Sequence, residues 1–331
     1  MQMPGLSLSW EDYEYGGEAD SALVIRWPDL PHHVAFWRNY VPIWFFPDNV
    51  GFYFGWIEAA PYECLCDDER EHMQLEIIEE DSSVARIRWS MDLVTFGGRI
   101  YRGNTRVVED YEFRADGTCV RQATLYHGTE LDPKRNKDGY EISEFGVVNP
   151  PGTAPVDNLL RGKVVDRVID PFEGSQFDLL WEEDSGGIVR SSGWREDVAQ
   201  WKAQVHMLMK KGDMCPYVVF GRDTMPVGHY PEKYLVWGLS FEKSVLTFSH
   251  WPRKMDEYYV HENRSRGIRD LALPTHTPIL SCQFKRKCDE IASPLAFRWL
   301  IGVAGEEEML DRSREWLFGE GQKRRHATIN E

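Results

Sequence analysis

One stretch of the sequence, residues 250–276, concentrates side chains that can transfer protons or bind an anion. It holds three histidines, two adjacent tyrosines and several arginines. Removal of a proton next to a carboxylate needs such a set, because an arginine can pair with the acid while a histidine and a tyrosine act as base and acid. The stretch therefore suggests β-elimination of a uronate sugar. A solvated, charge-rich loop with incidental histidines is the alternative.

Each group in this stretch can be given an expected role. The base is expected to be His250 or His276, and the acid Tyr258 or Tyr259. The carboxylate of the substrate is expected to pair with Arg253 or Arg266. Trp251 is expected to stack on a sugar ring.

A second group lies at the end of an expected strand, in "TLYHG". His127 is a candidate catalytic or ligand-binding residue there, and Arg121 earlier in the strand is a candidate substrate-binding residue. Glu130 follows closely. A surface histidine with no role in catalysis is the alternative for His127.

The segment 39–58, "NYVPIWFFPDNVGFYFGWIE", is dense in aromatic residues. Aromatic rings stack on the apolar faces of sugars, and Trp44 and Trp56 would suit this role. Packing in the core beneath a loop is the alternative interpretation. Nearby carboxylates, Asp48 among them, could serve a glycoside hydrolase, although sequence spacing does not indicate their separation in space.

Well-known cofactor and catalytic motifs are absent from the sequence. It contains no phosphate-binding loop, no GxSxG, no HExxH and no glycine-rich dinucleotide turn. His32-His33 and the pair His72 and Glu76 could ligate a metal, but the second pair falls in an expected strand that would separate the two side chains. We therefore expect no metal and no cofactor.

Charge limits the class of partner. The chain has 54 acidic and 38 basic residues, a net charge of −16. Binding to nucleic acid is not expected, because neutralising phosphates requires a basic surface. A few local arginines could still bind an anionic sugar. The expected partner is thus a carbohydrate or another small molecule.

Location in the cell stays open. No apolar run has membrane-spanning length. The first residues lack the features of a signal peptide. The protein would be cytoplasmic if Met1 is its native start, and secreted or periplasmic if a signal has been removed. None of the six cysteines forms a CxxC pair, and we expect mostly free structural thiols.

Alternation of apolar and polar residues predicts antiparallel strands along most of the chain. The stretch 84–93 is a half-buried strand, and 107–113 with 119–126 form a hairpin around Asp116-Gly117, expected to be a tight turn with both residues at positive φ. Further strands are expected at 164–169, 177–181, 217–220, 234–241, 244–249 and 278–284.

Two helices are expected at the periphery. Spacing of apolar residues predicts one at 195–211, and another at 306–318 that ends at Gly319. Residues 127–163 are expected to be a long loop, and 321–331 a frayed polar tail. Residues 1–320 are then a single all-β domain, a large antiparallel β-sandwich resembling a supersandwich, with a lipocalin-type barrel as the alternative.

Two parts of the sequence together resemble a known group of proteins. They are "ARIRWSMDLV" with "VVEDYEFRADGTCVRQATLY", and "FSHWPRK" with "LPTHTPILS". The pattern resembles uncharacterised bacterial all-β carbohydrate-active proteins, similar in style to polysaccharide lyases and galactose-mutarotase-like supersandwiches. The resemblance covers about a third of the chain and carries over no catalytic motif residue by residue. It implies a carbohydrate ligand.

The leading expectation is therefore a lyase acting on an acidic polysaccharide or oligosaccharide. A non-catalytic carbohydrate-binding module would share the aromatic residues but would not bring the histidines, tyrosines and arginines together. An intracellular β-barrel isomerase or cyclase that binds an apolar molecule is the third possibility.

Overall fold

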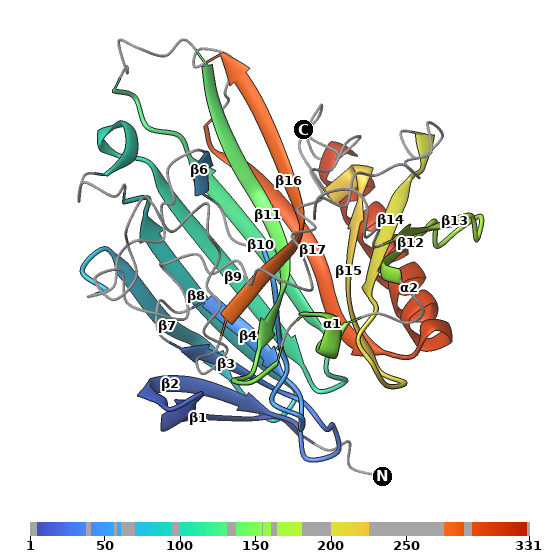
Figure 1. Cartoon of the computed structure of the whole chain (residues 1–331). Coiled ribbons are helices and arrows are strands. Elements are labelled where there is room, and N and C mark those ends of the chain that lie inside the picture. Colours follow the sequence, from blue (N-terminus) through green and yellow to red (C-terminus); the bar gives the residue numbers. More distant parts are fainter. Residues whose placement is uncertain are drawn as a thin grey trace.

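The structure is a computed structural model of the whole chain (Figure 1). It describes residues 5–37, 41–55, 58–60, 70–94, 100–130, 137–153, 155–159, 164–180, 200–224, 275–287 and 293–329.

The described chain is mostly antiparallel strand, arranged in two sheets. One sheet has the order β1-β2-β3-β4-β5-β11-β16, with β6 also paired to β11, and the other has the order β13-β12-β14-β15-β17-β10-β9-β8-β7. The expected all-β sandwich is confirmed, and neither sheet closes into the barrel considered as the alternative. The first sheet contains β1 (Ser7–Tyr15), β2 (Glu18–Arg26), β3 (His33–Trp37), β4 (Val41–Phe45), β5 (Gly51–Phe54), β6 (Glu58–Ala60), β11 (Lys137–Asn149) and β16 (Thr275–Lys287). The second contains β7 (Met73–Glu80), β8 (Val84–Asp92), β9 (Arg106–Arg114), β10 (Cys119–Tyr126), β12 (Val164–Ile169), β13 (Gln176–Leu180), β14 (Ala203–Leu208), β15 (Cys215–Gly221) and β17 (Leu295–Ala304).

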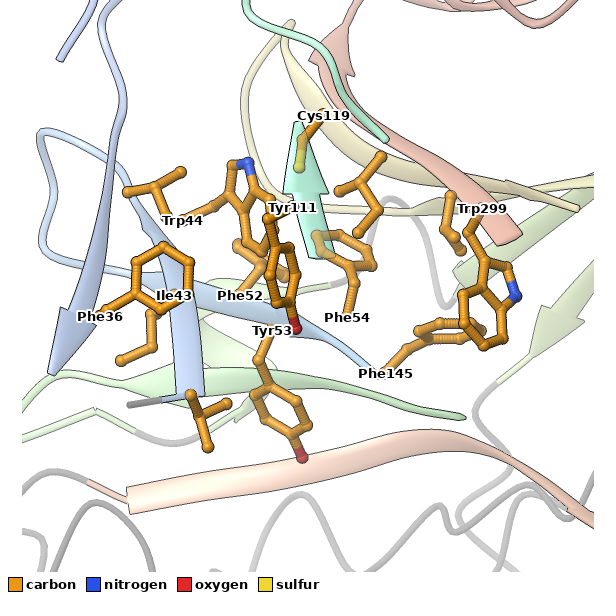
Figure 2. Close-up of a cluster of buried hydrophobic side chains, with 14 of the residues drawn as sticks. Phe36, Ile43, Trp44, Phe52, Tyr53, Phe54, Tyr111, Cys119, Phe145 and Trp299 are labelled. Carbon is orange, nitrogen blue, oxygen red and sulfur yellow. The ribbon is translucent and has the colours of Figure 1, made fainter. Parts of the chain in front are cut away.

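A shared core joins the two sheets. Figure 2 shows Trp44 and Phe54 from the eight-stranded sheet beside Tyr111 from the nine-stranded sheet. The Trp44 ring meets Phe54 edge-on at 5.4 Å between centroids and lies 6.2 Å from the ring of Phe113. Aromatic pairs at such separations add stability beyond the area they bury. Much of the high aromatic content therefore serves this core.

The β9–β10 hairpin was predicted correctly, but its turn differs from the expectation. The amide of Gly117 donates to the carbonyl of Arg114, and the amide of Arg114 donates to the carbonyl of Thr118. Gly117 has a φ of 84°, whereas Asp116 is not among the residues at positive φ. Three residues thus form the connection, with a single left-handed glycine, instead of two residues that both need positive φ. Asp116 instead accepts hydrogen bonds from Thr118.

Helix α2 (Glu306–Ile329) covers part of the outer face of the nine-stranded sheet (Figure 1). Its buried residues Met309 and Trp316 pack with Val205 of β14 and Val219 of β15. The expected end at Gly319 is wrong, and so is a frayed tail, because the helix continues to Ile329. A glycine inside a helix costs only about 1 kcal/mol relative to alanine, and the residues that follow are mostly good helix formers.

The helix expected at 195–211 is wrong over residues 203–208, which form β14. Every residue of β14 is buried, because the core covers one face and α2 the other. A strand buried on both faces shows no alternation, so its apolar residues can mimic helical spacing. Residues 181–199 lie outside the described residues.

The loop expected at 127–163 is also wrong in part. Residues 137–149 form β11, which pairs with β5, β6 and β16, and 155–158 form the short helix α1 (Pro155–Asn158). Partner strands far along the chain hold this glycine- and charge-rich segment in the sheet, because tertiary context overrides weak strand propensity. The strands expected at 84–93, 164–169, 177–181, 217–220 and 278–284 correspond to β8, β12, β13, β15 and β16, while 234–241 and 244–249 lie outside the described residues.

Candidate functional site

Most of the residues expected at the site lie outside the described residues. The residues outside the described part of the chain are Trp56, His250, Trp251, Arg253, Tyr258, Tyr259 and Arg266. Their roles at the site therefore stay predictions.

His127, directly after β10, forms a hydrogen-bonded pair with Tyr140 of β11. Nδ1 of His127 lies 2.5 Å from the hydroxyl oxygen of Tyr140. The two rings meet edge-on with centroids 5.5 Å apart. His127 is half-buried, whereas Tyr140 is fully buried. The bond joins the two sheets at one point.

The loop that carries His127 is fixed by hydrogen bonds to neighbouring segments. The His127 amide donates to Oγ of Ser293, at 3.1 Å. The Gly128 amide donates to Oγ1 of Thr105, and its carbonyl accepts from Nε of Arg102. Tyr101 packs edge-on against Tyr140 with centroids 6.0 Å apart. These contacts hold the imidazole in a defined position, as a proton-transfer group requires.

Arg121, in contrast, lies inside the core. Its guanidinium makes two hydrogen bonds to the Glu109 carboxylate, of 2.8 and 2.5 Å, and lies 4.4 Å above the Trp299 ring. Tyr111 also donates a hydrogen bond to Glu109. Arg121, Glu109 and Tyr111 are all essentially without solvent exposure. The guanidinium is thus committed to an internal carboxylate and not presented to a substrate.

Burial and neighbouring groups shift the pKa of Arg121 in opposite directions. Burial disfavours the charged guanidinium, but Glu109 and Tyr111 outweigh it and raise the pKa of Arg121 above its ordinary value. Burial, together with the adjacent Glu109, raises the pKa of the Tyr111 hydroxyl well above its usual range. Arg121 therefore stays charged and Tyr111 neutral near pH 7, as expected for a stabilising ion pair and not for a proton donor.

Trp44 does not offer a ring face to a ligand in the structure. Its side chain is fully buried in the aromatic core (Figure 2). The alternative interpretation of this aromatic segment, core packing, describes Trp44 better than sugar stacking does.

The arrangement of β11 separates His276 from His127. The backbone of His276 pairs with Val148, eight residues along β11 from Tyr140. At about 3.3 Å per residue this is on the order of 25 Å along the strand. Arg121 is six residues from His127 on β10, which is about 20 Å by the same rise. Arg121, His127 and His276 thus do not share one site.

A histidine–carboxylate pair between β14 and β12 was missed from the sequence. Nδ1 of His206, on β14, lies 2.7 Å from Oδ2 of Asp166, on β12, and both side chains are fully buried. Nε2 of His206 lies 3.4 Å from Oε1 of Gln204, and the ring packs 5.1 Å from that of Phe220. Apolar spacing predicts a peripheral helix at 195–211, so the internal position of His206 does not follow from the sequence. Complete burial favours a structural role.

Metal and thiol chemistry have little support among the described residues. In that part of the chain, no cluster of three or more His, Cys, Asp or Glu side chains could hold a metal ion. His33 instead bonds to the Tyr13 hydroxyl at 2.8 Å. Cys119 and Cys215 are buried free thiols, as expected. No helix in the described chain is both long and apolar enough to cross a bilayer.

Comparison with known proteins gives only distant likenesses. No protein-family model matches the chain, and no curated protein matches it. Among solved structures, a "putative mutarotase (YeaD)" from Salmonella typhimurium is 10% identical, with a TM-score of 0.39, and covers 90% of this chain and 94% of its own. A galactose 1-epimerase from Lactobacillus acidophilus is 10% identical, with a TM-score of 0.34, covering 91% of this chain and 99% of its own. Likenesses this weak assign no family and no activity to the chain.

Proposed function

We propose that this protein acts on a carbohydrate by proton transfer, with His127 and Tyr140 as the proton-transfer pair. The hydrogen bond between His127 Nδ1 and the Tyr140 hydroxyl carries the proposal. A histidine and a tyrosine in hydrogen-bond contact can exchange one proton, so that one ring nitrogen accepts while the other donates.

The position of the pair fits this role better than that of the other buried polar groups. His127 is half-buried as a residue, although its Nε2 atom is itself covered, while Tyr140 is fully buried. His206 with Asp166, and Arg121 with Glu109, are fully buried on both sides. A catalytic group must reach its substrate, and this favours His127.

The finer proposal is β-elimination from a uronate-containing sugar. It requires a cation for the substrate carboxylate in addition to the base and acid. Arg102 donates its Nε to the carbonyl of Gly128, which supports the loop. We therefore propose that Arg253 or Arg266 pairs with the carboxylate, with His250, Tyr258 or Tyr259 in the same site.

The same pair could instead interconvert the anomers of a neutral reducing sugar, which needs a base for the anomeric hydroxyl and an acid for the ring oxygen. Two assays separate the reactions. Incubation with uronate polymers should produce an unsaturated product with near-ultraviolet absorbance if elimination occurs. Polarimetry on freshly dissolved sugars should show faster equilibration if anomers are interconverted.

Variants test the assignment in either assay. His127→Gln and Tyr140→Phe should each abolish most of the activity, while Tyr126→Phe should not. Tyr126 is the matched control, because it adjoins His127 but is 44% exposed. Sugar binding without turnover would instead support a carbohydrate-binding module, and equal activity in all variants would exclude the His127–Tyr140 pair.

A further inference from the structure

Two pockets lie on the outer side of the nine-stranded sheet, and the first of them is lined by α2. The first has a volume of about 220 Å³ and lies between the β9–β10 hairpin and α2, with Arg114, Arg312 and Trp316 in its lining. The second has a volume of about 180 Å³ and lies over β8, β9 and β10, with Glu112 and Arg298 in its lining.

Two ion pairs connect the pockets. Nη2 of Arg114, in the first, lies 2.8 Å from Oε1 of Glu112, in the second. Nη1 of Arg298, in the second, lies 2.7 Å from Oε2 of Glu320, in the first. The two pockets are therefore neighbours. We call them together the α2 groove and define it by Glu112, Arg114, Arg298, Arg312, Trp316 and Glu320.

The lining of the α2 groove is balanced in charge. The two pockets together are lined by five arginines and five acidic residues, although the whole chain carries a net charge of −16. A balanced lining favours neither an anion nor a cation. It presents planar donors beside carboxylate acceptors, the groups that can bind several hydroxyls of a neutral ligand at once.

Two hydrogen-bond donors among the residues that line this groove have no acceptor within the described part of the chain. They are Nε1 of Trp316 and Nε of Arg298, and both atoms are buried. The whole Trp316 side chain is only 6% exposed. A buried donor without an acceptor destabilises a fold, so an oxygen supplied at these positions would be favoured.

We propose that the α2 groove binds a neutral polyhydroxylated molecule of the size of a mono- or disaccharide. Its oxygens accept from Trp316 Nε1 and Arg298 Nε, and its hydroxyls donate to Glu320. Each pocket is smaller than the roughly 300–1,000 Å³ of sites for drug-sized ligands, which suits one sugar ring per pocket. The groove involves neither His127 nor Tyr140, so it is a binding site in addition to the proposed reaction site.

The indole N–H signal of Trp316 in a ¹H–¹⁵N spectrum tests the proposal directly. Trp316→Phe assigns the signal, because it removes one indole resonance and keeps an aromatic ring. Titration with neutral mono- and disaccharides should shift this signal downfield, since the N–H gains an acceptor. Inorganic phosphate and glucuronate at the same concentration should shift it much less.

Two arginine variants supply the matched comparison. Arg312→Gln and Arg314→Gln each remove one charge and one ion pair from α2, to Glu308 and Asp311 respectively, but only Arg312 lines the groove. In this proposal Arg312 also donates to a ligand oxygen, so Arg312→Gln should weaken sugar binding about tenfold, as for loss of a charge-assisted hydrogen bond, and Arg314→Gln should leave it unchanged.

Three results would overturn the proposal. They are no shift of the Trp316 signal with any neutral sugar, stronger binding of the anions, or equal weakening by both arginine variants. His127→Gln protein should bind as tightly as wild type, so a failure of the groove is distinguishable from a failure of the reaction site.

Discussion

Nδ1 of His127 lies 2.5 Å from the hydroxyl of Tyr140, and this bond links the end of β10 in one sheet to β11 in the other. The two residues are 13 positions apart in sequence. Both ends are anchored, since Tyr140 lies in the paired region of β11 and β16, and the His127 amide bonds to Ser293. The pair is thus a fixed internal contact, and His127 is its less buried member.

The buried Arg121–Glu109 pair should be strongly coupled. Arg121→Met leaves the Glu109 carboxylate buried without its cation, and we expect a loss of about 3–5 kcal/mol in the free energy of unfolding. The double variant Arg121→Met/Glu109→Leu should be less destabilised than that single variant, because no isolated charge remains. Urea unfolding measures both.

An exposed pair between the neighbouring strands β8 and β9 provides the control. Arg88 bonds to Asp110 at 2.7 Å on the outer face, with 44% of the Arg88 side chain exposed. Arg88→Met should therefore change stability by no more than about 1 kcal/mol. An equal loss for Arg88→Met and Arg121→Met would show that burial of the Arg121–Glu109 pair does not explain the cost of removing Arg121.

His32 should make the protein less stable in acid. Its side chain is 2% exposed, and neither ring nitrogen has a hydrogen-bond partner among the residues that the structure describes. Burial, with smaller contributions from His33 and Arg312, lowers the pKa of His32 from 6.5 to about 4. As pH falls from 6.5 to 4, the unfolded chain takes up the proton and the folded chain does not, so stability is lost over this window.

The size of this effect follows from the shift. It amounts to at most about 3.5 kcal/mol, at about 1.4 kcal/mol per pKa unit. His32→Phe keeps a ring against Trp27 and Phe46 but cannot titrate. Stability measured from pH 7 to 4 should fall less steeply in this variant, and an unchanged slope would show that His32 does not titrate as described.

Gly117 should be sensitive to any side chain, for two separable reasons. Its φ of 84° is left-handed, and an added Cβ would collide with Cδ1 of Leu30. Gly152, with a φ of 83°, has no atom within 4 Å of such a Cβ. Gly152→Ala should cost about 1–2 kcal/mol for backbone strain alone, and Gly117→Ala clearly more. Equal losses in thermal unfolding would mean that the Leu30 contact is relieved without cost.

Parts of the fold could be predicted because one-sided burial leaves a readable pattern. In β8, the buried residues Ile87, Trp89 and Met91 alternate with exposed Arg86 and Arg88, so the strand and its inner face follow from the sequence. Where both faces are buried, as in β14, the alternation is lost and a helix was predicted instead. A strand buried on both faces cannot be distinguished from a helix by such a pattern without knowledge of the neighbouring elements.

Only part of the candidate site could be predicted from the sequence, for a related reason. His127 could be singled out at the end of an obvious strand, but its partner Tyr140 lies in "KDGYEISEFG", a segment with weak strand propensity. Pairing with β16, more than 130 residues away, makes this segment a strand. Long-range pairing of this type is not encoded in local spacing, so the His127–Tyr140 contact could not be found from the sequence.

The rate of sugar turnover in Tyr140→Phe protein tests the central claim most directly. The variant removes one oxygen and keeps the ring against Tyr101, so a structural role for the ring would survive it. We predict a loss of about 10²–10⁴-fold in the elimination or anomer-interconversion assay, matched by His127→Gln and not multiplied in the double variant. Wild-type turnover by Tyr140→Phe, or no turnover of either class of sugar by the wild-type protein, would contradict the account.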